Sequence, residues 1–106
     1  MEKVLVELKY ANRYGHSDVE PFEIVRVISD NTLDVRAMRV QRDPTWTPEF
    51  VAGGFVAHCT NQNEQRWIYS SDPSLPVLRI RMSKKGWAQG SFRLSDKPVK
   101  FYDYNF

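Results

Sequence analysis

The residues best suited to covalent chemistry stand together near the middle of the chain. Cys59 follows His58, and Asn61 and Asn63 come shortly after, so this segment contains the residue types of a Cys-His-Asn catalytic set. Adjacent residues of a strand point to opposite faces, however, so sequence neighbours seldom form a nucleophile and its base. The simpler interpretation makes Cys59 a small buried apolar residue and gives the amide side chains to backbone groups of a loop. We expect no catalytic residue, and an enzyme that uses this constellation is the third functional hypothesis.

Metal and phosphate sites find little support. The chain has one cysteine and two histidines, His16 and His58, and it contains neither a CxxC nor an HExxH motif. Gly53-Gly54 leads into a strand-like segment and lacks the Lys-Ser/Thr pair of a phosphate-binding loop. The sequence therefore predicts no metal site and no cofactor.

Basic residues are concentrated in the last third of the chain. Residues 76–106 contain seven Lys and Arg against two acids, whereas residues 1–34 contain four against seven. Cations beside an aromatic ring are typical of surfaces that bind nucleic acids through phosphates and stacked bases. The alternative is a solvated strand face with the tryptophan in the core, its charges mixed with the acids of the first third. The candidate nucleic-acid-binding residues are Arg79, Arg81, Lys84, Lys85 and Trp87.

Aromatic residues make up 13% of the chain, and several lie in irregular or terminal segments. Those in the proline-containing connection of residues 41–50, and just after it, either pin that segment to the core or form a hot spot for a protein partner. Residues 101–106 include four aromatics. We expect them to be the closing strand of a barrel, the alternative being a peptide that docks on a partner. The candidate protein-binding residues are Trp46, Phe50, Phe55, Asn61, Asn63 and Arg66.

Strands must position these side chains, because apolar and polar residues alternate with a period of two along much of the chain. Residues 12–18 are a predicted loop, and residues 29–32 a tight turn that joins two strands into a hairpin. Helical periodicity over about ten residues is absent, and one helical turn within residues 60–66 is the expected exception. The predicted strands cover residues 4–10, 22–28, 33–38, 55–58, 66–69, 77–82, 91–94 and 99–104.

The chain is therefore predicted to be a single mainly β domain spanning residues 1–106. About six to eight short strands indicate a small, partly open barrel, SH3-like or similar, with at most one short helical turn. The longest apolar runs have three residues, far fewer than the roughly 20 of a membrane-spanning helix, and the start of the chain lacks the pattern of a secretory signal. We expect a cytoplasmic protein without a membrane partner.

Two segments carry a resemblance to a known group of proteins. They are residues 53–67, with the sequence GGFVAHCTNQNEQRW, and residues 101–106, with the sequence FYDYNF. On these segments the chain resembles small accessory proteins of tailed phages and mobile elements. The resemblance, which covers most of the chain, implies a viral accessory protein in the host cytoplasm and transfers no catalytic residue. The leading hypothesis is a non-enzymatic module that binds a host protein such as an enzyme or defence factor; the alternative is a nucleic-acid-binding barrel.

Overall fold

Six antiparallel strands close into a barrel in the computed structural model, which describes residues 8–53 and 56–105. Their order around the barrel is β1-β10-β9-β8-β3-β2. The prediction of a mainly β chain with a small barrel is confirmed, and the barrel is closed rather than partly open. The predicted hairpin is also confirmed, because β2 pairs with β3 across the turn at residues 29–32. The strands are β1 (Tyr10–Tyr14), β2 (Val19–Ser29), β3 (Thr32–Ala37), β8 (Val77–Ser83), β9 (Gly86–Trp87) and β10 (Phe92–Ser95).

The period-two alternation fills the barrel with apolar side chains. Leu33 and Val35 on β3 are fully buried, and the Phe22 and Phe92 rings meet edge to face with their centroids 5.1 Å apart. Trp87 is only 6% exposed and belongs to this core. The buried core consists of Ala11, Phe22, Leu33, Val35, Ile80, Trp87 and Phe92.

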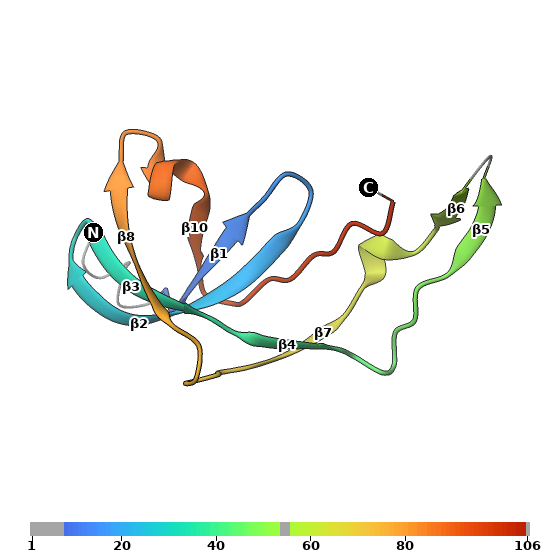
Figure 1. Ribbon diagram of the computed structural model, residues 1–106, viewed down its shortest axis with the longest axis horizontal. Helices are drawn as coiled ribbons and strands as arrows, with labels where there is room; N and C mark the ends of the chain where they lie inside the picture. Colours follow the sequence, from blue (N-terminus) through green and yellow to red (C-terminus); the bar gives the residue numbers. More distant parts are fainter. Residues whose placement is uncertain (1–7, 54–55, 106) are drawn as a thin grey trace.

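An extension leaves the barrel after β3 and returns before β8 (Figure 1). In it β4 (Arg39–Arg42) pairs with β7 (Trp67–Ser70), and we call this two-stranded ribbon the arm. Beyond the arm, β5 (Phe50–Gly53) pairs with β6 (Val56–Cys59), and a short 3-10 helix, η1 (Gln62–Glu64), leads back to β7. We call residues 43–53 and 56–66 the distal lobe. The extension gives the molecule dimensions of 50 × 29 × 24 Å.

The helical turn predicted within residues 60–66 is confirmed by η1. It and η2 (Ala88–Gly90) are helices of three residues each. Within residues 8–53 and 56–105, no helix has the length and apolar character needed to cross a membrane.

Residues 96–105, which we call the strap, run from β10 along the arm to the distal lobe (Figure 1). They form no strand of the barrel, although Phe101 and Val19 make an isolated bridge with two N–H···O bonds of 2.9 Å. The prediction that the end of the chain is the closing strand, with a strand over residues 99–104, is therefore wrong. Closure comes instead from β1, which pairs with β10 on one side and β2 on the other.

The start of the barrel also differs from the sequence-based expectation. The predicted strand at residues 4–10 lies mostly outside the described residues, and β1 begins at Tyr10. The predicted loop is wrong for residues 12–14, which belong to β1. Asn12 is 2% exposed, and its side chain accepts the Val99 N–H at 2.9 Å and donates to the Lys97 carbonyl at 3.2 Å. A fully paired amide can occupy a buried strand position, which the polarity of the sequence does not reveal.

The turn that seats Trp87 in the core has an unusual backbone. Gly86, Ala88, Gln89 and Gly90 have φ angles of 111°, 48°, 63° and 88°, all in the left-handed region that favours glycine. At Gly90 a Cβ atom would lie 2.8 Å from the Lys85 carbonyl oxygen, closer than van der Waals contact allows. This turn therefore requires glycine at position 90 for two independent reasons.

We predict that Gly90→Ala lowers the free energy of unfolding by about 1–3 kcal/mol, because the new methyl group adds a clash to an unfavourable φ. Gly86→Ala should cost less, since its Cβ would have 3.5 Å of space. Gly15→Ala is the matched control, because its Cβ would make ordinary contact at 3.5 Å and no positive φ is involved. Urea unfolding measures all three, and an effect at Gly90 no larger than at Gly15 would contradict the assignment of strain.

Candidate functional site

Side-chain amides of the distal lobe bind the backbone of the strap where a neighbouring strand would otherwise do so. Gln65 donates from Nε2 to the Tyr102 carbonyl at 3.0 Å and accepts the Tyr102 N–H on Oε1 at 2.8 Å. Gln62 accepts the Tyr104 N–H on Oε1 at 2.9 Å. The paired contact at Tyr102 reproduces what two strands exchange in an antiparallel ladder. The amide side chains therefore fix the register of the strap on the lobe.

Cys59 is part of the same attachment and not of a catalytic set. It is 2% exposed, and Asn105 accepts its backbone N–H at 2.7 Å and donates to its carbonyl at 2.9 Å. Asn61 lies 3.5 Å from the Cys59 sulfur, but its Oδ1 also accepts the Glu49 N–H at 2.8 Å. His58 is exposed, so it lies on the opposite face of β6 from the buried thiol. The interpretation of Cys59 as a buried apolar residue, with amides serving loop backbone groups, is confirmed.

Strap and distal lobe together build a contiguous group of rings, which we call the aromatic patch: Trp46, Phe50, Tyr102 and Tyr104. Tyr104 lies at its centre, with ring centroids 5.7 Å from Trp46, 6.2 Å from Phe50 and 4.7 Å from Tyr102. The contacts of Tyr104 with Phe50 and Tyr102 are edge to face, the geometry that the ring quadrupoles favour. Because the strap backbone is held by Gln65, the rings it carries are fixed in position.

Half of this patch faces solvent. Phe50 is 50% exposed and Tyr102 is 45% exposed. Trp46 is buried at 7% exposure, and its indole Nε1 has no hydrogen-bond partner within residues 8–53 and 56–105. Exposed rings on a fixed support are the side chains that most often anchor a protein interface.

The protein-binding residues predicted from the sequence are only partly brought together. Trp46 and Phe50 both enter the patch, whereas Phe55 lies outside the described residues. Asn61 fixes loop backbone, and Asn63 and Arg66 are exposed on η1 and just before β7. The predicted protein-binding residues do not include Tyr102 and Tyr104, because the sequence favours a barrel strand over residues 99–104; only the alternative of a terminal docking peptide covers them.

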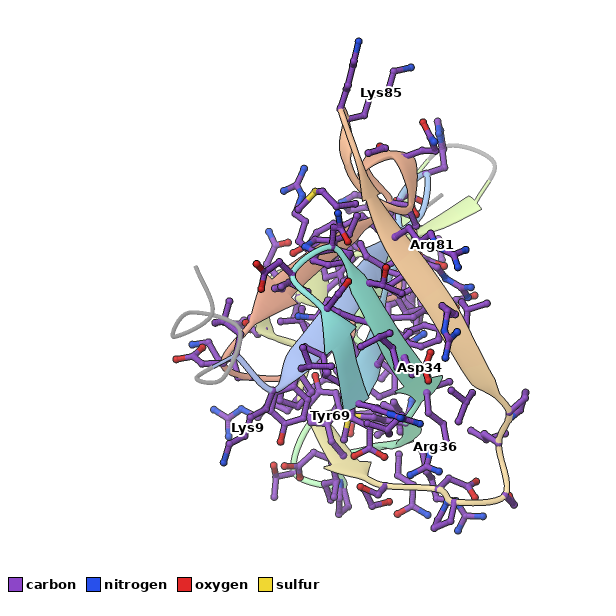
Figure 2. The ribbon with its side chains drawn as sticks, turned by 90° about the vertical axis from the view of Figure 1, so that its left-hand side faces the viewer. Lys9, Asp34, Arg36, Tyr69, Arg81 and Lys85 are labelled. Atoms are coloured by element: carbon purple, nitrogen blue, oxygen red, sulfur yellow. The ribbon has the colours of Figure 1, made fainter. Side chains whose placement is uncertain are left out.

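The predicted nucleic-acid-binding residues are divided between surface and core. Arg81 lies on the exposed face of β8 and Lys85 at the tip of the following turn (Figure 2), where Lys84 is exposed as well. Arg79, on the same face, makes two bonds to the Asp34 carboxylate, 2.8 Å from Nε and 3.2 Å from its terminal nitrogen. Trp87 is in the core and offers no ring to a base. An acid of the first third thus pairs with a base of the last third.

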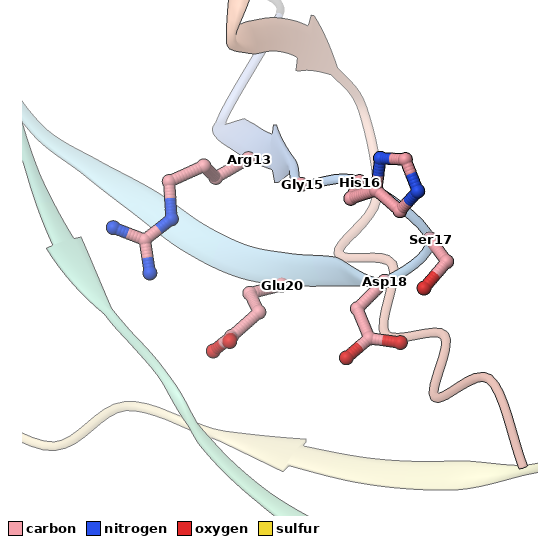
Figure 3. Close-up of a pocket in the computed structure, with 6 residues that line it drawn as sticks. All are labelled: Arg13, Gly15, His16, Ser17, Asp18 and Glu20. Carbon is pink, nitrogen blue, oxygen red and sulfur yellow. The ribbon is translucent and has the colours of Figure 1, made fainter. Parts of the chain in front are cut away.

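A hollow of about 310 Å³ lies beside the turn between β1 and β2 (Figure 3). The side chains of Asp18 and Glu20 point to the same side of β2. Asp18 already accepts the Asp103 N–H on Oδ1 at 2.9 Å and so helps to hold the strap. The lining residues, all from this hairpin, are Arg13, Gly15, His16, Ser17, Asp18 and Glu20.

The aromatic patch is the strongest candidate site in the described part of the chain. It combines half-exposed rings, a fixed backbone and a buried donor that lacks an acceptor. Groups of three or more His, Cys, Asp or Glu side chains able to hold a metal ion do not occur among the residues that the structure describes. Comparison with protein-family models, curated proteins and solved structures finds no match to this chain.

We predict that Gln65→Glu loosens the strap locally without unfolding the barrel. The carboxylate keeps the Oε1 acceptor but puts an oxygen in place of the Nε2 donor, so the bonds to the Tyr102 and Gln62 carbonyls are lost, at about 1 kcal/mol for each bond. Amide hydrogen exchange at Tyr102 and Tyr104 should accelerate on the order of tenfold, while exchange at Val35 stays unchanged. Gln41→Glu, at an exposed position of β4, is the control. Equal acceleration in the strap and at Val35 would count against a local role.

The Asp34–Arg79 pair predicts a pH dependence of stability. The hydrogen bond from Arg79 lowers the pKa of Asp34 from its ordinary 3.8 in the folded protein. The pair's contribution to the free energy of unfolding is thus present above pH 3.8 and is lost as the pH falls through the lowered folded pKa. The difference in unfolding free energy between the wild type and Asp34→Asn should therefore shrink in acid. In an Arg79→Gln background, the effect of Asp34→Asn on the free energy of unfolding should be small at every pH. An effect as large as in the wild-type background would contradict the pairing.

Proposed function

We propose that this protein is a non-enzymatic binding module that recognises a protein partner through its aromatic patch. The observation that carries the proposal is the half exposure of Phe50 and Tyr102 within a group of rings that contact one another. Burying an aromatic side chain removes on the order of 150–250 Å² from water, so a few such rings can dominate the affinity of an interface.

Preorganisation adds to the case for this patch. The paired hydrogen bonds of Gln65 to Tyr102 fix the strap, and the contacts of Tyr104 fix its neighbours. A partner therefore does not have to immobilise a loose loop on binding, which lowers the entropic cost of association. The β5–β6 hairpin and the end of the strap, which contribute rings to the patch, lie toward the end of the extension that is remote from the barrel (Figure 1).

The proposed partner is a host protein, with an enzyme or a defence factor as the leading candidates, and the proposed location is the host cytoplasm. The support is the resemblance to small accessory proteins of phages and mobile elements. The two segments that carry this resemblance, residues 53–67 and 101–106, contribute Gln65, Tyr102 and Tyr104 to the patch and its attachment.

Nucleic-acid binding by β8 and its turn is the alternative proposal. Exposed Arg81, Lys84 and Lys85 favour it. It has less support than the aromatic patch, because Asp34 neutralises Arg79 and Trp87 lies in the core. The enzyme hypothesis has the least support, because Cys59 is buried away from His58.

We predict that Phe50→Ser and Tyr102→Ser each reduce the recovery of specific partners at least about tenfold, as expected when an interface anchor is removed. The test is affinity capture by the tagged full chain from nuclease-treated bacterial lysate, with the wild type alongside. Val77→Ser and Leu78→Ser are matched controls, since these residues are 52% and 44% exposed on the barrel.

Unfolding curves must first establish that each variant is folded. Capture that is equal in the patch variants and the wild type would overturn the proposal. Recovery from a parallel untreated lysate that disappears after nuclease treatment would instead favour the nucleic-acid alternative.

A further inference from the structure

The first part of β8 has a neighbouring strand on one side only. On one side β8 pairs with β3 from Val77 to Arg81, whereas on the other side β9 pairs only with Met82 and Ser83. The barrel closes through the two residues of β9, which do not reach the start of β8. Within residues 8–53 and 56–105, no strand pairs with this second side of residues 77–80, which we call the open edge.

The backbone groups of the open edge belong to Val77 and Arg79. The N–H and carbonyl groups of successive strand residues point alternately to the two sides of the strand. The Met82 N–H donates to the Asn31 carbonyl at 2.9 Å, so the even-numbered residues of β8 direct their backbone groups toward β3. Those of Val77 and Arg79 therefore point away from β3, and they have no hydrogen-bond partner in the part of the chain that the structure describes.

Positive charge lies beside the open edge. Arg81 is exposed on the outer face of β8, and Lys84 and Lys85 are exposed in the turn that follows (Figure 2). Arg79 is neutralised by Asp34, but the other three cations make no ion pair with any described residue. A ligand at this edge is therefore favoured by negative charge.

The inner face of the open edge is apolar. Leu78 lies on the same face of β8 as Ile80, because the two residues are one alternation apart. Ile80 is 3% exposed in the core, whereas Leu78 is 44% exposed, as expected where no strand lies beside it. A strand added here would cover Leu78.

We propose that the open edge binds an extended segment of a partner protein as an added β-strand, in which acidic and apolar residues alternate. The unpaired backbone groups of Val77 and Arg79 bond to this strand, which is how extended peptides add to exposed sheet edges. Its acidic side chains lie beside Arg81, and its apolar side chains cover Leu78. A nucleic acid would satisfy the cations but would offer no strand to the backbone groups. This surface is on the barrel and is distinct from the aromatic patch, so the inference goes beyond the proposed function.

The test is a titration of the ¹⁵N-labelled full chain with a seven-residue peptide in which valine and glutamate alternate. In the free chain the Val77 and Arg79 amides should exchange rapidly with solvent, and saturating peptide should slow their exchange at least about tenfold. A peptide with lysine in place of glutamate should bind at least about tenfold more weakly, because its charges repel Arg81. A peptide with proline in place of valine should not protect these amides, because proline cannot donate to a ladder.

Two substitutions at Val77 separate the backbone from the side chain. Val77→Pro removes an N–H that points away from β3, which an edge strand tolerates, and it should weaken binding about fivefold through the loss of one hydrogen bond. Val77→Ser keeps this N–H and is the matched control, which should bind as the wild type does. Arg81→Glu leaves the backbone unchanged and should prefer the lysine peptide. Urea unfolding establishes that each variant is folded.

Slow exchange of the Val77 and Arg79 amides in the free chain would overturn the inference, because the edge would already be paired. The absence of a saturable change at millimolar peptide would also overturn it, as would equal protection by the proline peptide or equal affinity for the lysine peptide. Tighter binding of a strand of ten thymidine nucleotides than of the glutamate peptide would replace it with nucleic-acid binding. The proposed function is tested separately, by partner capture with the Phe50 and Tyr102 variants.

Discussion

The attachment of the strap by side-chain amides is the interaction on which the order of the extension depends. The arm and the β5–β6 hairpin are each only two strands wide, and isolated two-stranded units are marginally stable in water. The strap connects both units to the barrel. At its start, the Asn12 side chain of β1 bonds to strap backbone, and at its middle the Gln65 side chain does so. At its end, the side chain of strap residue Asn105 bonds to the Cys59 backbone. Each contact satisfies backbone groups that lack a ladder partner, so each is a condition for the segment to be ordered.

The barrel supports this attachment, and the aromatic patch that we propose for binding lies on the extension and the strap. Closure pairs β1 with both of its neighbours, and the interior takes up Phe22, Phe92 and Trp87. These three aromatic side chains are therefore committed to the core. Those of the strap and distal lobe have only a thin layer to pack against, so Phe50 and Tyr102 remain half exposed. An exposed ring that the fold itself immobilises is suited to binding by contact.

Electrostatics follows the topology of the barrel and not the order of the residues. The chain is acidic at its start and basic at its end, which taken alone suggests two oppositely charged regions. Because β3 and β8 are neighbours, Asp34 of the acidic part lies directly opposite Arg79 of the basic part. The bidentate pair neutralises both groups. Segregation along the sequence therefore becomes local pairing in the folded molecule at this point.

Local patterns in the sequence determined β2, β3, β6, β7, β8 and β10, the β2–β3 hairpin and the single turn of η1, because period-two alternation and turn residues act between near neighbours. Only the tertiary structure decided that residues 12–14 are a strand, since they pair with β2 and β10, and that residues 99–104 are not, since side chains and one isolated bridge hold that backbone. The sequence predicts Trp46 and Phe50 as binding residues, but only the tertiary structure joins them to Tyr104, because amide side chains that bind distant backbone follow no period along the chain.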